Sequence, residues 1–155
     1  MSTARPATSD DIPEVVRMGA LMFESMGQAV GGPWREVAEA ALAERLGDTC
    51  AAFVVDDPGV PGRVVASAAV SLHDRLPSPS NPTGCWGYVQ YVATDPGHRR
   101  RGHARAVMEA VLAWLDERGV TAAELHATPE GAGLYTSLGF GEGPNPSLRR
   151  VAAST

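Results

Sequence analysis

The strongest pattern in this sequence is a helical stripe that follows an apolar strand and a basic turn. Its apolar or small side chains recur three and four positions apart, which places them on one face of an α-helix. They are Ala104, Val107, Met108, Val111, Leu112 and Leu115. An apolar segment over 86–93 precedes the stripe, and Gly119 is suited to end the helix. The pattern predicts a helix packed against a β-sheet.

The remaining segments show either the helical spacing of apolar residues or the short apolar runs typical of strands. Thr8 and Asp11 have the spacing of a capping box, with Pro13 in the first helical turn. Further helices are expected over about 12–26, 34–46 and 132–138. Strands are expected over 3–7, 50–55, 64–70, 86–93 and 124–127, with two more near Phe140 and Leu148. The segments 50–55 and 64–70 should pair as a hairpin, and the proline-rich segment 76–84 should form a mobile loop.

Length and composition indicate one soluble domain over residues 1–155. The chain has 155 residues, 44% of them hydrophobic and 20% charged, which is enough for one sizeable core. Cys50 and Cys85 are too sparse for a disulfide framework or a metal-binding cysteine pair, so both are expected as reduced core thiols. The first residues resemble no secretory signal, and no run of about 18 apolar residues could span a bilayer. A cytoplasmic protein without membrane insertion is expected.

Positive charge is concentrated in one short segment of an acidic chain. The net charge is −5, which argues against nucleic-acid binding because a polyanion needs a broad positive surface. All 13 basic residues are arginine, and Arg99, Arg100, Arg101 and Arg105 lie within seven positions. This cluster predicts a local anionic ligand, with a solvated arginine patch as the alternative.

The arginine cluster lies where the strand over 86–93 turns into the strongest helix. The start of a helix leaves backbone N–H groups unpaired and carries a partial positive charge, so it can hold an anion. Gly102 and Ala104 are small enough for a phosphate to reach those amides. The turn therefore predicts a pyrophosphate site, although neither a G-x-G-x-x-G nor a P-loop sequence is present.

Two separated motifs resemble the GNAT superfamily of acetyltransferases. Arg99, Gly102 and Ala104 fill the pattern Arg/Gln-x-x-Gly-x-Gly/Ala of that family's acyl-CoA loop, just after the strand end Val92-Ala93-Thr94. The stretch 134–140 is similar to the family's Leu-Tyr-x-x-Leu-Gly-Phe signature. The opening segment Arg5-Pro-Ala-Thr8 and the helix after it also resemble the family, so the resemblance covers most of the chain.

The resemblance implies an α+β fold of three layers. In that fold a mixed, mostly antiparallel sheet of six or seven strands is flanked by about four helices, and two central strands splay apart to hold acyl-CoA. It also implies an acetyl-CoA-dependent N-acetyltransferase without a metal. The implied cofactor-binding residues are Val92, Ala93, Thr94, Arg99, Arg100, Arg101, Gly102, His103, Ala104 and Arg105.

The implied catalytic residue is Tyr135, placed beside the sulfur of the coenzyme. A tyrosine has a pKa of about 10 and a free thiol about 8.5, so Tyr135 would keep its proton at neutral pH and could donate it to the departing thiolate. The alternative is a tyrosine that only packs against Leu134 and Leu138.

The sequence leaves several functions open. The acceptor is an amine of unidentified class, and the general base is a water molecule or Glu24, His73 or Glu142. Acyl groups other than acetyl remain possible. Thr128-Pro-Glu-Gly131 replaces an asparagine with which many relatives contact the cofactor. Dimers are common among relatives, but no residue pattern here indicates an interface. A non-catalytic acyl-CoA sensor is the alternative function.

Overall fold

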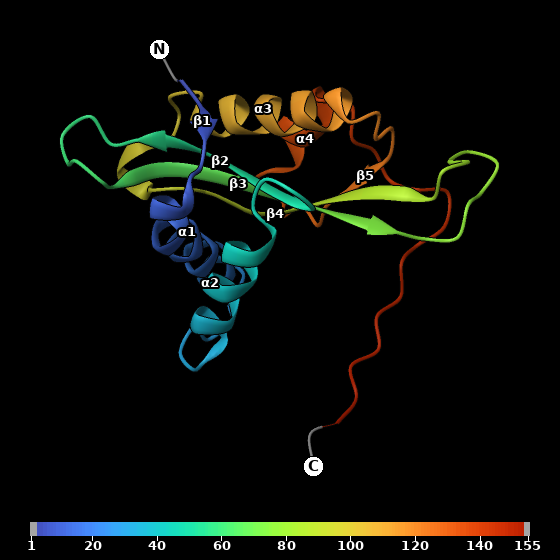
Figure 1. Ribbon diagram of the computed structural model, residues 1–155, viewed down its shortest axis with the longest axis horizontal. Helices are drawn as coiled ribbons and strands as arrows, with labels where there is room; N and C mark the ends of the chain where they lie inside the picture. Colours follow the sequence, from blue (N-terminus) through green and yellow to red (C-terminus); the bar gives the residue numbers. More distant parts are fainter. Residues whose placement is uncertain (1–2, 154–155) are drawn as a thin grey trace.

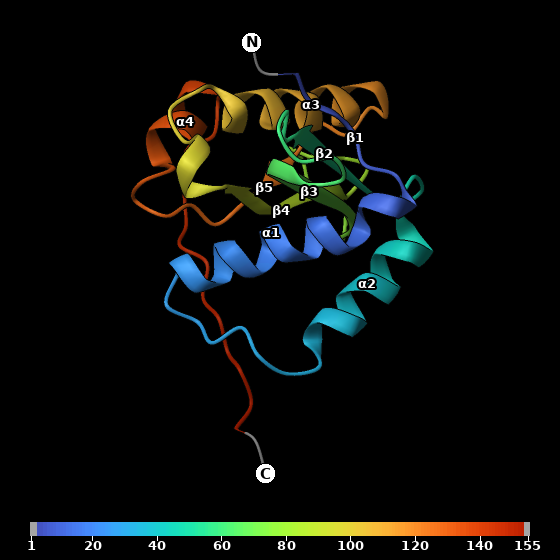
Figure 2. The same cartoon turned by 90° about the vertical axis from the view of Figure 1, so that its left-hand side faces the viewer.

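The computed structural model describes residues 3–153 as three layers (Figures 1 and 2). A central sheet has α1 and α2 on one face and α3 and α4 on the other. The helices are α1 (Ile12–Ser25), α2 (Trp34–Arg45), α3 (His103–Glu117) and α4 (Ala132–Ser137), with short 3-10 turns at Ser9–Asp11 and Pro96–His98. The strands are β1 (Arg5–Pro6), β2 (Cys50–Asp56), β3 (Val64–Asp74), β4 (Cys85–Thr94) and β5 (Ala123–Glu124).

The sheet follows chain order, β1-β2-β3-β4-β5. Its first four strands are antiparallel neighbours, and the expected hairpin is confirmed as β2 and β3. β5 is parallel to β4 and pairs with it only through Gly87 with Ala123 and Tyr88 with Glu124. β4 continues to Thr94 without a partner on that side, so β4 and β5 separate, in agreement with the expectation that two strands splay apart.

Each face of the sheet has its own hydrophobic core. The stripe of α3 packs Val107, Met108, Val111 and Leu115 onto alternate residues of β2, β3 and β4. On the opposite face, α1 buries Val15, Val16 and Met18 against the other set of residues in β2 and β3. These two cores fix the helices that border the site described below.

The expected capping box of Thr8 and Asp11 is confirmed, and it caps the 3-10 turn Ser9–Asp11 that leads into α1. The backbone N–H of Thr8 donates to Asp11 Oδ2 at 2.7 Å, and Arg5 contacts the same carboxylate at 2.8 Å. Pro13 lies in the first turn, where the missing N–H leaves no bond unmade. Cys50 is buried and Cys85 partly buried, and both are free thiols. Within the described residues, each helix is too short or too polar to cross a lipid bilayer.

The expected strand count was wrong. The sheet has five strands, because the part of the chain described after α4 forms none near Phe140 or Leu148. Pro144 and Pro146 remove backbone donors from this segment, and Gly141 and Gly143 offer no side chains for packing. The α+β class, the four flanking helices and the mostly antiparallel pairing are confirmed. The segment 76–84 is an irregular loop joining β3 to β4, and its mobility stays a prediction.

Candidate functional site

A cleft of about 510 Å³ opens where β4 and β5 separate. Its walls come from the end of α1, the end of β4, the loop before α3, the first turn of α3, and the segment from Thr128 through α4. The lining residues are Leu21, Met22, Ser25, Val92, Ala93, Thr94, His98, Arg99, Arg100, Gly102, His103, Ala104, Arg105, Thr128, Glu130, Gly131, Leu134 and Tyr135.

A bulge in β4 shapes the floor of the cleft. Ala69 pairs with Gln90 and Ser67 pairs with Ala93, so Tyr91 and Val92 together face the single residue Ala68. The extra residue of a bulge is left out of the hydrogen-bond ladder and turns the strand locally. Tyr91 has a φ of 56°, an unusual value for a residue with a side chain. The buried hydroxyl of Ser67 donates to the Tyr91 carbonyl oxygen at 2.7 Å and holds this conformation.

The side chain of Tyr91 leaves the cleft floor and joins an aromatic group under α1. Its ring meets Phe23 edge to face at a centroid distance of 5.9 Å, and Phe23 meets Trp34 in the same way at 5.5 Å. Burial raises the pKa of the Tyr91 phenol. Val92, Ala93 and Thr94, rather than Tyr91, are therefore the residues of β4 that line the cleft.

The arginine-rich loop combines two left-handed residues with the start of α3. Arg100 has a φ of 65° and Gly102 a φ of 81°, and Gly102 caps α3. Glycine adopts this conformation without strain, which explains its use immediately before the helix. Arg99 and Arg100 are exposed residues of the cleft lining, and the first turn of α3, the positive end of its dipole, borders the same space.

Asp95 anchors the beginning of this loop to the rest of the protein. It is buried, and its carboxylate lies 3.5 Å from Arg17 Nη1 and 3.4 Å from Arg63 Nη2. Its backbone N–H donates to the Val65 carbonyl oxygen at 2.8 Å. Arg17 in turn contacts Glu14 at 2.7 Å. The loop therefore leaves β4 from a position fixed by α1 and the start of β3.

Tyr135 stands on α4 at the opposite wall of the cleft. Its ring packs edge to face against Phe140 at 6.2 Å, and burial raises the pKa of its phenol above the usual value for tyrosine. Gly131 lies under the ring, because a Cβ at residue 131 would fall 2.9 Å from Tyr135 Cε2. A hydrogen bond joins α4, which carries Tyr135, to α3: Arg105 Nη2 donates to Ser137 Oγ at 2.7 Å.

The structure brings together all the predicted site residues except Arg101, which does not line the cleft. Arg101 Nη1 instead lies 3.2 Å from Nδ1 of His98. Eight further lining residues are not among the predicted site residues, although the sequence places Thr128–Gly131 at a position where relatives contact the cofactor. They are Leu21, Met22, Ser25, His98, Thr128, Glu130, Gly131 and Leu134. Burial, His98 and Arg101 lower the pKa of the His103 imidazole.

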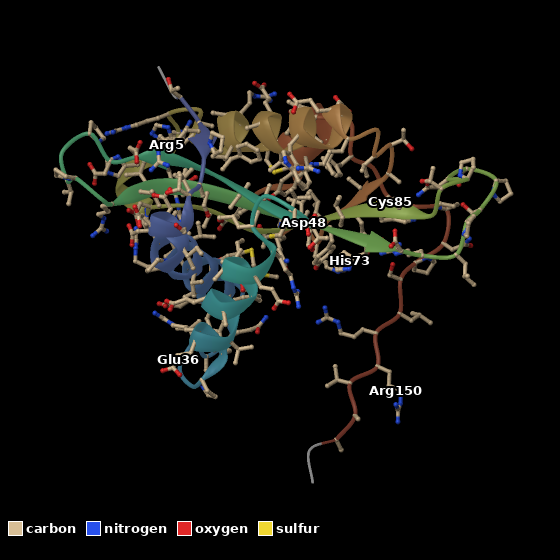
Figure 3. All side chains as sticks on the ribbon, in the orientation of Figure 1. Arg5, Glu36, Asp48, His73, Cys85 and Arg150 are labelled. Atoms are coloured by element: carbon tan, nitrogen blue, oxygen red, sulfur yellow. The ribbon has the colours of Figure 1, made fainter. Side chains whose placement is uncertain are left out.

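The proposed general bases lie elsewhere. Glu24, His73 and Glu142 are all exposed, and none of them lines the cleft. Figure 3 shows His73 on the sheet face that carries α1 and α2, beyond the end of those helices. Among residues 3–153, no group of three or more His, Cys, Asp or Glu side chains is arranged to hold a metal ion.

Comparison with known proteins decides the family. Residues 20–140 match the acetyltransferase (GNAT) family. The chain belongs to the GNAT family. It is 32% identical over 135 residues to N-acetyltransferase Eis of Mycobacterium tuberculosis (strain ATCC 25177 / H37Ra), covering 86% of this chain but 31% of that relative. The chain thus spans about a third of the length of the curated GNAT relatives it matches.

Solved structures share the GNAT fold over nearly the whole chain. A GCN5-related N-acetyltransferase from Ralstonia eutropha JMP134 has 28% identity and a TM-score of 0.82, covering 97% of this chain and 99% of that one. A protein from Clostridium acetobutylicum, described as a predicted acetyltransferase with acetyl-CoA, has 20% identity and a TM-score of 0.85, covering 97% and 96%. The second likeness shows the fold alone, and that fold agrees with the layers in Figure 2.

Proposed function

We propose that this chain transfers the acetyl group of acetyl-CoA to a primary amine. The observation that carries the proposal is the convergence of the β4 bulge, the start of α3 and the Tyr135 phenol on one cleft. Family membership supports the donor, since GNAT acetyltransferases use acetyl-CoA. The names of the relatives, which include N-acetyltransferases, support nitrogen as the acceptor atom.

The cleft fits a coenzyme of this kind in volume and chemistry. Its volume of about 510 Å³ lies in the usual range for small-molecule sites, roughly 300–1,000 Å³. Gly102 and Ala104 leave the first amides of α3 accessible to a phosphate group. Arg99, Arg100 and Arg105 add positive charge at the same end. We assign this end of the cleft, with His103, to the pyrophosphate of the coenzyme.

The backbone of Val92–Thr94 would orient the remainder of the coenzyme, which supplies the acetyl thioester. The bulge frees a main-chain group from the ladder, and a freed N–H near Val92 can donate to the thioester carbonyl. One such donor contributes about 3–4 kcal/mol to stabilising a developing oxyanion. Positioning both reactants contributes about 7–11 kcal/mol more.

Tyr135 would act as the acid that protonates the departing sulfur. Its raised pKa keeps the phenol protonated at neutral and mildly alkaline pH, so the proton is available when charge develops. This role supports catalysis rather than binding alone, because a sensor of acyl-CoA needs no proton donor at that position.

The remaining predictions concern the organisation of the protein. We propose one catalytic domain over residues 1–155, a cytoplasmic location, no nucleic-acid partner and acetyl as the transferred group. The homodimer common among relatives stays a prediction. None of these proposals is required for the chemistry of the cleft.

Two measurements test the proposed function together. Calorimetry with coenzyme A measures binding, and a thiol assay with a panel of primary amines measures acetyl transfer from acetyl-CoA. We expect heat of binding and amine-dependent thiol release. Binding without transfer would assign the chain to acyl-CoA sensing instead. No binding at millimolar coenzyme would contradict both functions.

A further inference from the structure

The sheet face under α1 has a second half that no helix within residues 3–153 covers. Side chains alternate between the faces of a strand, so Ser71 and His73 follow Ala69 on the face that carries α1 and α2. On β4, Tyr88 pairs with Ser71 and Trp86 pairs with His73 on that same face. Figure 3 shows His73 beyond the end of α2. This uncovered half carries hydroxyl, imidazole and aromatic side chains, whereas the covered half is lined by the aliphatic side chains of the core.

Hydroxyl, imidazole and phenol groups form a continuous row across this uncovered half. Ser71 Oγ lies 2.7 Å from His73 Nε2. The His73 ring meets the Tyr88 ring edge to face at 6.4 Å, and Tyr88 meets His126 in the same way at 5.8 Å. Leu125 packs into the core on the α3 side, so the next side chain, His126, points to the opposite face. The row therefore ends at an exposed imidazole.

His126 stands where β4 and β5 part. The last paired residues are Tyr88 and Glu124, and His126 lies two residues beyond that pair. On β4 the bulge at Tyr91–Val92 begins three residues beyond Tyr88. Strand residues advance about 3.3 Å each, so the imidazole and the bulge lie within a few residue steps of the same opening. Thr128, two residues after His126, already lines the cleft.

Most other titratable groups are less suitably placed for an acceptor amine. Glu130 is the one carboxylate of the described cleft lining, and a Glu130→Gln variant separates its contribution to the pH profile from that of His126. Glu24 and Glu142 belong neither to the cleft lining nor to this row, and His73 sits at the far end of the row. His126 is not a lining residue itself, but it belongs to the row and lies two residues before Thr128, which does line the cleft. His98 and His103 line the cleft beside the arginines. These two imidazoles therefore border the end that we assign to the phosphates.

We propose that His126 accepts the proton of the acceptor amine, which would approach along the uncovered sheet face. This inference rests on the proposed acetyl transfer. A neutral imidazole nitrogen can accept a proton from an ammonium group that it contacts, which is the step the acceptor needs before it can attack the thioester. This role would make His126 a catalytic residue and Tyr88 a positioning residue that holds the imidazole edge to face.

Every proton that moves in the reaction passes through His126, Tyr135 or the solvent. The ammonium acceptor gives one proton to His126, and the resulting amine nitrogen bonds to the thioester carbon. The carbon–sulfur bond breaks, and sulfur receives the proton of Tyr135. The nitrogen then loses its second proton, which restores the Tyr135 phenol, and His126 releases its proton to solvent. The products are an acetylated amine, a free thiol and one proton.

The charged and titratable groups around His126 are few. Tyr88 contacts the ring directly, and His73 lies on the other side of Tyr88. Glu124 precedes His126 by two residues and lies 3.3 Å from Arg75. Burial raises the pKa of the Tyr88 phenol, and Arg149 acts on it in the opposite direction. A pH profile must therefore compare variants at His126 with a variant at His73.

The test is the pH dependence of acetyl transfer in His126→Gln, with the acceptor that gives the highest rate in the amine panel. We expect kcat at pH 7 to fall about 10²-fold or more, with KM for acetyl-CoA and the heat of coenzyme A binding unchanged. The rate should rise with pH as the free amine becomes abundant. His126→Ala should recover activity when imidazole is added to the solution. Glu142→Gln, in the exposed C-terminal segment, should keep the wild-type profile.

Each result decides between defined alternatives. A wild-type profile in His126→Gln, or an effect of that size in His73→Gln instead, would overturn the assignment of His126. Failure of imidazole to rescue His126→Ala would also count against a proton-transfer role. If the wild type binds coenzyme A but acetylates no amine in the panel, the proposed function fails first, and the inference falls with it.

Discussion

Gly19 on α1 lies directly against the ring of Tyr91 on β4. A Cβ at residue 19 would meet Tyr91 Cγ at 2.9 Å and both Cδ atoms at 3.0 Å. Tyr91 belongs to the bulge and has a left-handed backbone. The absence of a side chain at Gly19 therefore lets α1 approach the sheet at the point where β4 turns toward the cleft.

We expect Gly19→Ala to destabilise the protein by about 1–3 kcal/mol, the usual cost of overfilling a packed core. Gly97→Ala is the matched control, because a Cβ there meets no atom within 4 Å. Its effect should stay within about 0.5 kcal/mol. Urea unfolding of both variants measures the difference. Equal stabilities would show that the Tyr91 ring moves aside without cost.

Tyr135→Phe should lower kcat by about 10²-fold, since it removes the proposed acid and keeps the ring. The contact with Phe140 needs no hydroxyl, so the fold and coenzyme A binding should be retained. Initial rates and calorimetry on the same preparation separate the two effects. Transfer at the wild-type rate would leave Tyr135 with a packing role only.

Glu130→Gln should tighten coenzyme A binding by about twofold to fivefold. Glu130 is the one carboxylate among the described residues that line the cleft, and it faces a ligand with several negative charges. The gain should shrink at high ionic strength, because salt screens exposed charges. Glu36→Gln in the first turn of α2 is the control, because Figure 3 shows Glu36 at the end of α2 that lies farthest from the sheet. Weaker binding in Glu130→Gln would contradict this account.

The Arg5–Asp11 ion pair should make stability depend on acid pH. Arg5 lowers the pKa of the Asp11 carboxyl to about 2 by hydrogen bonding, below its unfolded value. The stabilisation is therefore present above about pH 4 and lost as the pH falls toward 2. After solvent screening it amounts to about 1 kcal/mol. Asp11→Asn should reduce the change in unfolding free energy between pH 2 and 4, and Arg5→Met should do the same. Unfolding curves between pH 2 and 7 measure it.

Much of the fold could be predicted because periodicity and caps act locally. The stripe of α3, the capping residues Thr8 and Asp11, and the hairpin of β2 and β3 all follow from spacing along the chain. The two strands expected after α4 were wrong for a physical reason. Apolar residues such as Phe140 and Leu148 indicate a strand, but a strand also needs a pairing edge and backbone donors.

The part of the candidate site that could be predicted is the part supplied by one continuous segment of the chain. The loop from Val92 to Arg105 is continuous in sequence, and its resemblance to a known motif carried nearly every predicted residue. Leu21, Ser25 and Glu130 reach the cleft only through the packing of α1 and the path of the chain after β5. Arg101 lies outside the cleft lining although its neighbours Arg100 and Gly102 belong to it, and its role in coenzyme binding stays a prediction.

The two residue pairs between β4 and β5 have a mechanical consequence. They are the only strand pairing by which the described residues after α3 join the sheet, so this attachment can fray without disturbing the ladders of β1 to β4. A molecule bound across the opening would hold β4 together with the segment that contains β5 and α4. Amide hydrogens of β5 and α4 would then exchange more slowly with solvent than in the free protein.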